Sequence, residues 1–287
     1  MAEAAGPGSL SSFHEHIPAV CPAMPRGIRS TLDSDVFQAR TIPIQYSQEQ
    51  SLATTTPPRP RSRSRRPMSI HDALTTISSE KAKQFAEEYF ALDPTYRGVG
   101  RYTGAHFESM GAEQNLPNQI TASDLLAVGT LSVNVPARAS IGIIGDLAED
   151  VSTLLAQIPA DARLGDLKGK DAFNSLLGPA SPSLALWHLL RRNAKNERRW
   201  GVGPTIASKI LARKRPHLIP IEDSVVDRVI KRGRQNSWRL WWEALAADDA
   251  LEKRASEVRE HIGRPQLSTL RTLDIVLWKS GQPSSEN

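Results

Sequence analysis

Proline is distributed unevenly along this chain, and its distribution limits where a compact fold can begin. Nine of the 20 prolines fall in residues 1–67, together with many serines, threonines and glutamines. The stretch 57–67 contains only proline, arginine and serine. Such a segment cannot bury enough apolar surface to offset the entropy of ordering its backbone. We therefore expect residues 1–67 to be a disordered tail and residues 68–287 to form a helical domain.

Met68 follows the tail directly and begins a segment with helical patterning. One hypothesis is that Met68 is the true start of the protein and that residues 1–67 are an upstream extension. Native protein with the intact mass of the whole 31.5 kDa chain would refute this hypothesis. The alternative is that the tail is a basic arm that adds non-specific affinity for phosphates.

Apolar residues recur at helical spacing from Ser78 onward, which predicts a mostly α protein. Ser78 and the run from Thr121 to Asp124 have the residue types that cap helix N-termini. Further helices are expected near 137–144, 146–157, 171–177, 182–194, 204–214, 224–232, 236–261 (broken near Asp248) and 267–280. Neither β-α-β alternation nor a nucleotide-binding glycine fingerprint occurs, which argues against a Rossmann or P-loop enzyme.

The composition narrows the class of protein further. The single cysteine, Cys21, cannot form an internal disulfide, a cysteine-based zinc site or an iron–sulfur cluster. No apolar run approaches the ~20 residues of a membrane span, and the N-terminus lacks a secretory signal. We therefore expect a cytoplasmic protein, associated with the nucleoid if it binds DNA, with no membrane contact, cofactor or metal. The oligomeric state stays open.

Positive charge is concentrated in one part of the chain. Residues 190–234 contain 13 lysines and arginines but only 4 aspartates and glutamates, whereas the whole chain has a net charge of +5. Such a concentration indicates a polyanionic partner, most simply nucleic acid. The alternative is a solvated helix face, which charge alone does not exclude.

The basic region contains a turn of two glycines separated by one residue, between two helical segments. Gly201, Val202 and Gly203 form the turn, and Pro204 then stands where a proline fits the first turn of a helix. Main-chain N–H groups at such a helix N-terminus suit a phosphate. An ordinary helix–turn–helix corner explains the same residues. The candidate DNA contacts are Gly201, Val202, Gly203, Thr205, Lys209 and Arg213, with Lys214 and Arg215 as further nearby charge.

Residues 187–280 resemble the helix-hairpin-helix DNA glycosylase superfamily, which has the endonuclease III-like fold. The resemblance includes the Gly-Val-Gly turn, the apolar-proline segment at 218–221 and the run Asp-Ser-Val-Val-Asp-Arg-Val at 223–229. The whole chain from Met68 also resembles a group of actinobacterial proteins of unknown function.

The glycosylase resemblance implies that Asp223 is a catalytic carboxylate beside the sugar of an extruded nucleotide. Asp223 is equally a favoured helix N-cap, and the two roles are compatible. Thr205 occupies the position where lyase-type members carry lysine, so the resemblance implies a monofunctional, water-using enzyme. Glu222 is an extra residue beside Asp223, and the four-cysteine cluster of some members is absent.

The sequence therefore favours a protein that binds double-stranded DNA through a helix-hairpin-helix, and glycosylase activity through Asp223 stays open. The alternative is a non-enzymatic interaction protein that keeps the hairpin as a scaffold. The tryptophans of 238–242 are expected to pack in the core rather than stack on bases. A further candidate for a groove lining is a cluster within 97–108; its members are Arg97, Arg101, Tyr102, His106 and Glu108.

Overall fold

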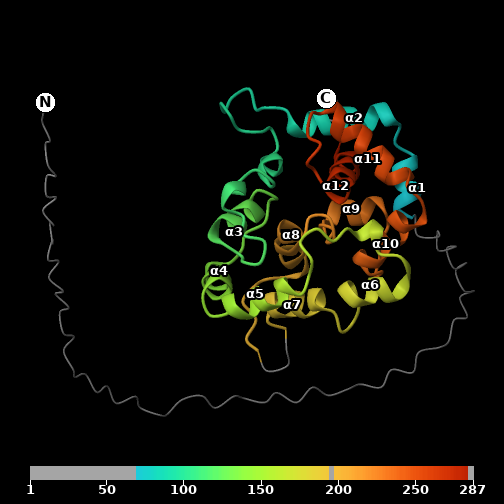
Figure 1. Ribbon diagram of the computed structural model, residues 1–287. Helices are drawn as coiled ribbons and strands as arrows, with labels where there is room; N and C mark the ends of the chain where they lie inside the picture. The colour runs from blue at the N-terminus through green and yellow to red at the C-terminus, as the bar shows by residue number, and fades with distance from the viewer. Residues whose placement is uncertain (1–68, 194–196, 284–287) are drawn as a thin grey trace, which may run out of the picture. The chain divides into compact units, whose positions relative to one another are not determined.

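The computed structural model describes residues 69–193 and 197–283 (Figure 1). The chain divides into two units, residues 1–60 and 61–287, and every described residue belongs to the second. The expectations for the tail of 1–67 and for Met68 lie outside the described residues.

The described part of the chain folds as a set of α-helices joined by turns and short 3₁₀ segments. The α-helices are α1 (Ile70–Thr75), α2 (Ser79–Phe90), α3 (Ala122–Gly129), α4 (Ala137–Ile144), α5 (Ala148–Ala156), α6 (Gly169–Leu177), α7 (Pro182–Arg191), α8 (Pro204–Lys214), α9 (Ser224–Val229), α10 (Ser237–Ala247), α11 (Ala250–His261) and α12 (Thr269–Ser280). Across 69–193 and 197–283, extended pairing is limited to one bridge, between Leu92 and Gly100. The predicted mostly α class is thus confirmed.

Capping residues explain where several helices begin. The Ser78 side chain accepts a hydrogen bond from Lys81 N at the start of α2, and Thr121 forms a capping box with Asp124 at the start of α3. The predicted break near Asp248 separates α10 from α11. The Ser78 and Thr121 side chains satisfy N–H groups that would otherwise lack an acceptor, so the starts of α2 and α3 follow from the local sequence.

Two helices end earlier than their patterns predict, and α1 was not predicted. Helix α7 ends where Arg192 adopts a left-handed conformation with φ of 44°, and Lys231 does the same with φ of 51° just after α9. A left-handed residue cannot continue a right-handed helix, so each helix stops before it. The remaining elements begin and end close to the predicted positions.

Helix α8 passes through the middle of the helical body, with α3 and α4 on one side and α9 and α12 on the other (Figure 1). Most of its residues from Ala207 onward are buried, as are most residues of α12. The predicted packing role of the tryptophans is confirmed, because Trp238, Trp241 and Trp242 are all buried in the core. No helix in 69–193 or 197–283 has the length and apolar character needed to cross a membrane.

Candidate functional site

The Gly-Val-Gly turn is held against α4 by its own apolar side chains. Trp200 is buried, donates from Nε1 to Leu190 O at 2.7 Å and packs against Gly142 of α4. Gly201 has φ of 90°, a conformation that favours glycine, and a Cβ there would lie 2.9 Å from Pro136 Cγ. The turn therefore needs glycine at 201 for two independent reasons.

The second glycine differs, because Gly203 has an ordinary φ of −86°. Gly203 is the N-cap residue of α8, and no side chain among the described residues caps this end of the helix. No atom lies within 4 Å of the point where a Gly203 Cβ would stand. Gly201 is exposed, Val202 is buried, and Thr205 is half-buried with its carbonyl accepting from Ser208 Oγ. The N-terminus of α8 is therefore open on the Gly203 side.

The basic residues at the C-terminal end of α8 are buried inside the protein. Arg213 is ion-paired with Asp124 at 3.1 Å and donates to the main-chain carbonyls of residues 107, 108 and 110. Lys214 pairs with the same Asp124 at 2.9 Å, and Arg215 donates to carbonyls of residues 117, 155 and 158. The expectation that these cations surround the hairpin at the surface is wrong, because their donors bind acceptors of the same chain.

Asp124 is a buried carboxylate that pairs with two of these cations, Arg213 and Lys214. Burial alone would raise the pKa of its carboxyl group, but hydrogen bonds from Thr121, Lys214 and Arg213 hold that pKa below its usual value. The charged region of α8 thus serves to join α8 to α3 and to residues 107–118.

Lys209 lies on α8 between the hairpin and the buried arginines, and it faces a cavity rather than the hairpin. Its side chain is 3% exposed; Nζ donates to Leu131 O at 2.9 Å and lies 3.7 Å from Asp223 Oδ2. Burial lowers the pKa of the Lys209 amine, and the charge of Asp223 opposes part of that effect. Lys209 is therefore not placed to contact a phosphate at the turn.

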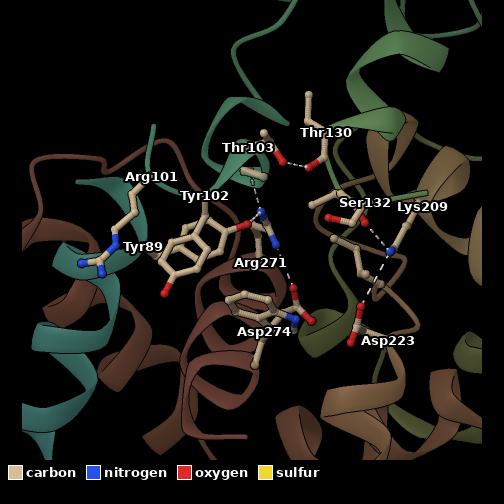
Figure 2. Close-up of a pocket in the computed structure, with 14 residues that line it drawn as sticks. Tyr89, Arg101, Tyr102, Thr103, Thr130, Ser132, Lys209, Asp223, Arg271 and Asp274 are labelled. Carbon is tan, nitrogen blue, oxygen red and sulfur yellow. Dashed lines mark hydrogen bonds and ion pairs between the residues drawn. The ribbon is translucent and has the colours of Figure 1, made fainter. Parts of the chain in front are cut away.

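The cavity has a volume of about 270 Å³ and is lined by segments that are far apart in the sequence (Figure 2). Its lining comprises Tyr89, Arg101, Tyr102, Thr103, Gly104, Thr130, Leu131, Ser132, Lys209, Ile221, Asp223, Arg271, Asp274 and Trp278. Ligand pockets for drug-sized molecules are roughly 300–1,000 Å³, so this one suits a ligand of one or two rings.

Asp223 lies at the start of α9, where its carboxylate caps the helix as predicted. Oδ1 accepts from Val225 N at 2.9 Å, which leaves Oδ2 directed at Lys209. The side chain is 21% exposed, so the carboxylate reaches the cavity instead of the packed core.

Arg271 and Asp274 form a second ion pair in the cavity, at 2.8 Å, and were not predicted as site residues. Arg271 also donates to Tyr89 Oη at 2.7 Å and to Glu108 Oε1 at 2.7 Å. Burial alone would lower the pKa of Arg271, but Tyr89, Glu108 and Asp274 together raise it. Burial raises the pKa of Asp274 to about 6, although Arg271 opposes the shift. Two charged residues within the apolar run of 270–277 were the available sequence signal.

Aromatic side chains form one wall of the cavity. Tyr89 and Tyr102 are stacked with ring centroids 5.6 Å apart, and Trp278 meets Tyr102 edge-on at 5.4 Å. Of the candidate cluster at 97–108, Arg101 and Tyr102 line the cavity, whereas His106 accepts a hydrogen bond from Gly100 N. Within the described ranges, no group of histidine, cysteine or acidic residues could hold a metal ion.

Comparison with known proteins places the chain in a family. A family model matches residues 82–281, which is more than half of the chain. The chain belongs to DUF6308, a family of unknown function. No curated protein and no solved structure matches the chain. The matched range of this DUF6308 protein includes the hairpin, the cavity and both ion pairs.

Proposed function

We propose that this protein binds duplex DNA through the hairpin of residues 200–204 and hydrolyses the base–sugar bond of a nucleotide that enters the cavity. The position of Asp223 carries the proposal, because its carboxylate lines the cavity 3.7 Å from the Lys209 amine. The resemblance of residues 187–280 to helix-hairpin-helix glycosylases implies a catalytic role for the same carboxylate.

The hairpin would bind a phosphate with main-chain groups and with exposed arginines, not with the buried cations of α8. The open N-terminus of α8 at Gly203 supplies N–H groups and the positive end of a helix dipole. Arg198 and Arg199 are exposed and immediately precede Trp200. Contacts of this kind hold a phosphate without reading the base sequence.

The hairpin and the cavity lie close together along the axis of α8. Gly203 and Lys209 are six residues apart on the same helix, which corresponds to about 9 Å along its axis. Phosphates of one strand advance by about 3.4 Å along a duplex, so this spacing along α8 corresponds to about three nucleotides. Tyr102 and Trp278, both partly exposed, offer an extruded base the aromatic contact that it loses on leaving the stack.

The proposed chemistry needs a carboxylate and water. As the bond between the base nitrogen and the anomeric carbon breaks, positive charge develops on that carbon, and Asp223 stabilises it. The oxygen of water bonds to the anomeric carbon, and the base leaves with a proton. Thr205 at the first turn of α8 provides no amine for a covalent intermediate, which agrees with direct attack by water.

The test measures base release from a panel of duplexes that each carry one damaged or mismatched base. Abasic sites are counted after alkaline cleavage. We expect release from at least one duplex, and we expect Asp223→Asn to slow it by at least about 100-fold with unchanged duplex affinity. Asp227→Asn is the matched control, because Asp227 also lies on α9 but pairs with Arg232 outside the cavity. No release by the wild-type protein, or equal rates for Asp223→Asn, would refute the enzymatic proposal.

A second candidate function is a protein-interaction scaffold without DNA chemistry. The observation that favours it is the burial of Arg213, Lys214 and Arg215, which removes three of the 13 lysines and arginines of residues 190–234 from the surface. This candidate predicts no measurable affinity for duplex DNA even at low salt, so the two functions are distinguished by a binding assay alone.

A further inference from the structure

One residue that lines the cavity has a carboxylate oxygen without a hydrogen-bond partner within the described part of the chain. Asp274 on α12 uses Oδ2 to accept from Arg271 Nη1 at 2.8 Å, while Oδ1 is buried and accepts no hydrogen bond. The residue is 5% exposed and lines the cavity. An unpaired buried polar atom is destabilising, and more so when it is charged. A ligand that brings an N–H donor to Oδ1 therefore gains affinity.

Lys209 brings a donor to the same cavity. Its ammonium group carries three N–H donors; one is used by Leu131 O, and Asp223 lies in reach of a second. The charge of Asp274 raises the pKa of Lys209, and the charge of Lys209 lowers the pKa of Asp274. Figure 2 shows both side chains converging on the cavity from α8 and α12. The site thus pairs one free acceptor with one free donor.

We propose that Asp274 and Lys209 recognise a heterocycle with an exocyclic amino group next to a ring nitrogen, as in adenine or cytosine. Asp274 Oδ1 accepts from the amino group, and Lys209 Nζ donates to the ring nitrogen. Thymine and uracil carry a carbonyl oxygen in place of the amino group, which would face the carboxylate as a second acceptor. This inference rests on the proposed function only in that a base enters the cavity.

The experiment compares two nucleosides that differ only in the exocyclic amino group, namely adenosine and purine riboside. Each is titrated into the full-length protein, and binding is measured by calorimetry and by ligand-observed NMR. A hydrogen bond to a charged acceptor contributes about 1.5–3 kcal/mol. We therefore expect adenosine to bind about 10- to 100-fold more tightly than purine riboside.

Two variants connect this preference to Asp274. In Asp274→Asn, Arg271 retains the amide oxygen, so the amide nitrogen faces the amino group of the ligand, and we expect the preference for adenosine to disappear. Glu108→Gln is the matched control. Glu108 also binds Arg271 and also has one unpaired buried oxygen, but it does not line the cavity. The control is expected to keep the preference, and circular dichroism confirms that both variants are folded.

Each outcome decides the inference separately from the proposed function. Equal affinities of the two nucleosides for the wild-type protein would overturn the role of Asp274 and would leave the cavity as a nucleoside site. A preference that survives in Asp274→Asn would overturn it as well. No binding of either nucleoside at millimolar concentration would overturn the inference, whereas the Asp223→Asn base-release assay would still test the proposed reaction. If Asp274→Asn does not fold, the wild-type comparison alone decides.

Discussion

Asp223 and Asp274 are carboxylates of one cavity whose surroundings give them different properties. Asp223 is partly exposed. Its Oδ1 accepts a hydrogen bond from Val225 N, and its Oδ2 faces the Lys209 amine. Asp274 is almost fully buried, and its pKa is raised to about 6 by that burial. Different surroundings allow two carboxyl groups of one site to have different roles.

The raised pKa of Asp274 predicts a specific dependence of stability on pH. The folded state binds the proton more tightly than the unfolded chain, whose aspartates titrate near 3.9. The free energy of unfolding therefore falls as the pH rises from about 4 to about 6. Asp274→Asn has no such proton to lose. Between pH 4 and pH 7 we expect the stability of the variant to improve relative to wild type by about 1–3 kcal/mol. Urea unfolding at both pH values measures the change, and a difference that does not vary with pH would contradict it.

At the scale of single elements, the same substitution is expected to cost more stability at Gly201 than at Gly203, the two glycines that precede α8. Gly201→Ala strains a left-handed residue and brings a methyl group against Pro136, so we expect a loss of about 1–2 kcal/mol or more in stability. Gly203→Ala meets open space at an ordinary φ and is expected to cost less than about 1 kcal/mol. Its methyl group instead occupies the open space beside the start of α8, where the proposed phosphate would bind. Thermal unfolding and duplex binding of both variants test this difference, and unchanged DNA affinity in Gly203→Ala would argue against the hairpin as the phosphate site.

The element boundaries were largely predictable, whereas the use of the charged side chains was not. Ser78, Thr121 and Asp223 start helices because each satisfies N–H groups within a few residues of itself. The fate of Arg213 depends on Asp124 and on carbonyls about 100 residues away, so no local pattern reveals its burial. Arg271 likewise meets Tyr89 only through the tertiary fold. Hydrogen bonds between residues that are close in the sequence can be predicted from it, whereas ion pairs between distant residues cannot.

At the scale of the whole molecule, the charge that the sequence concentrates in residues 190–234 is divided between two roles. Arg213, Lys214 and Arg215 hold α8 to the body of the protein, while Arg198 and Arg199 remain exposed beside the hairpin. Arg228, Lys231 and Arg234 of the same region are exposed as well. Only exposed cations can attract a polyanion, and with two of them beside the hairpin the number of phosphate contacts there is expected to be small. The buried group explains how a helix so rich in cations can occupy the centre of the fold.

The most direct test of the account is the affinity of the full-length protein for a random-sequence duplex at 50 mM and 200 mM salt. The logarithm of the binding constant falls by about 0.9 per phosphate contact for each tenfold rise in salt. With about three contacts at the hairpin, we expect binding to weaken by about 40-fold over this range, and by much less in the double variant Arg198→Glu, Arg199→Glu. An affinity that does not change with salt, or no binding at 50 mM salt, would contradict the account.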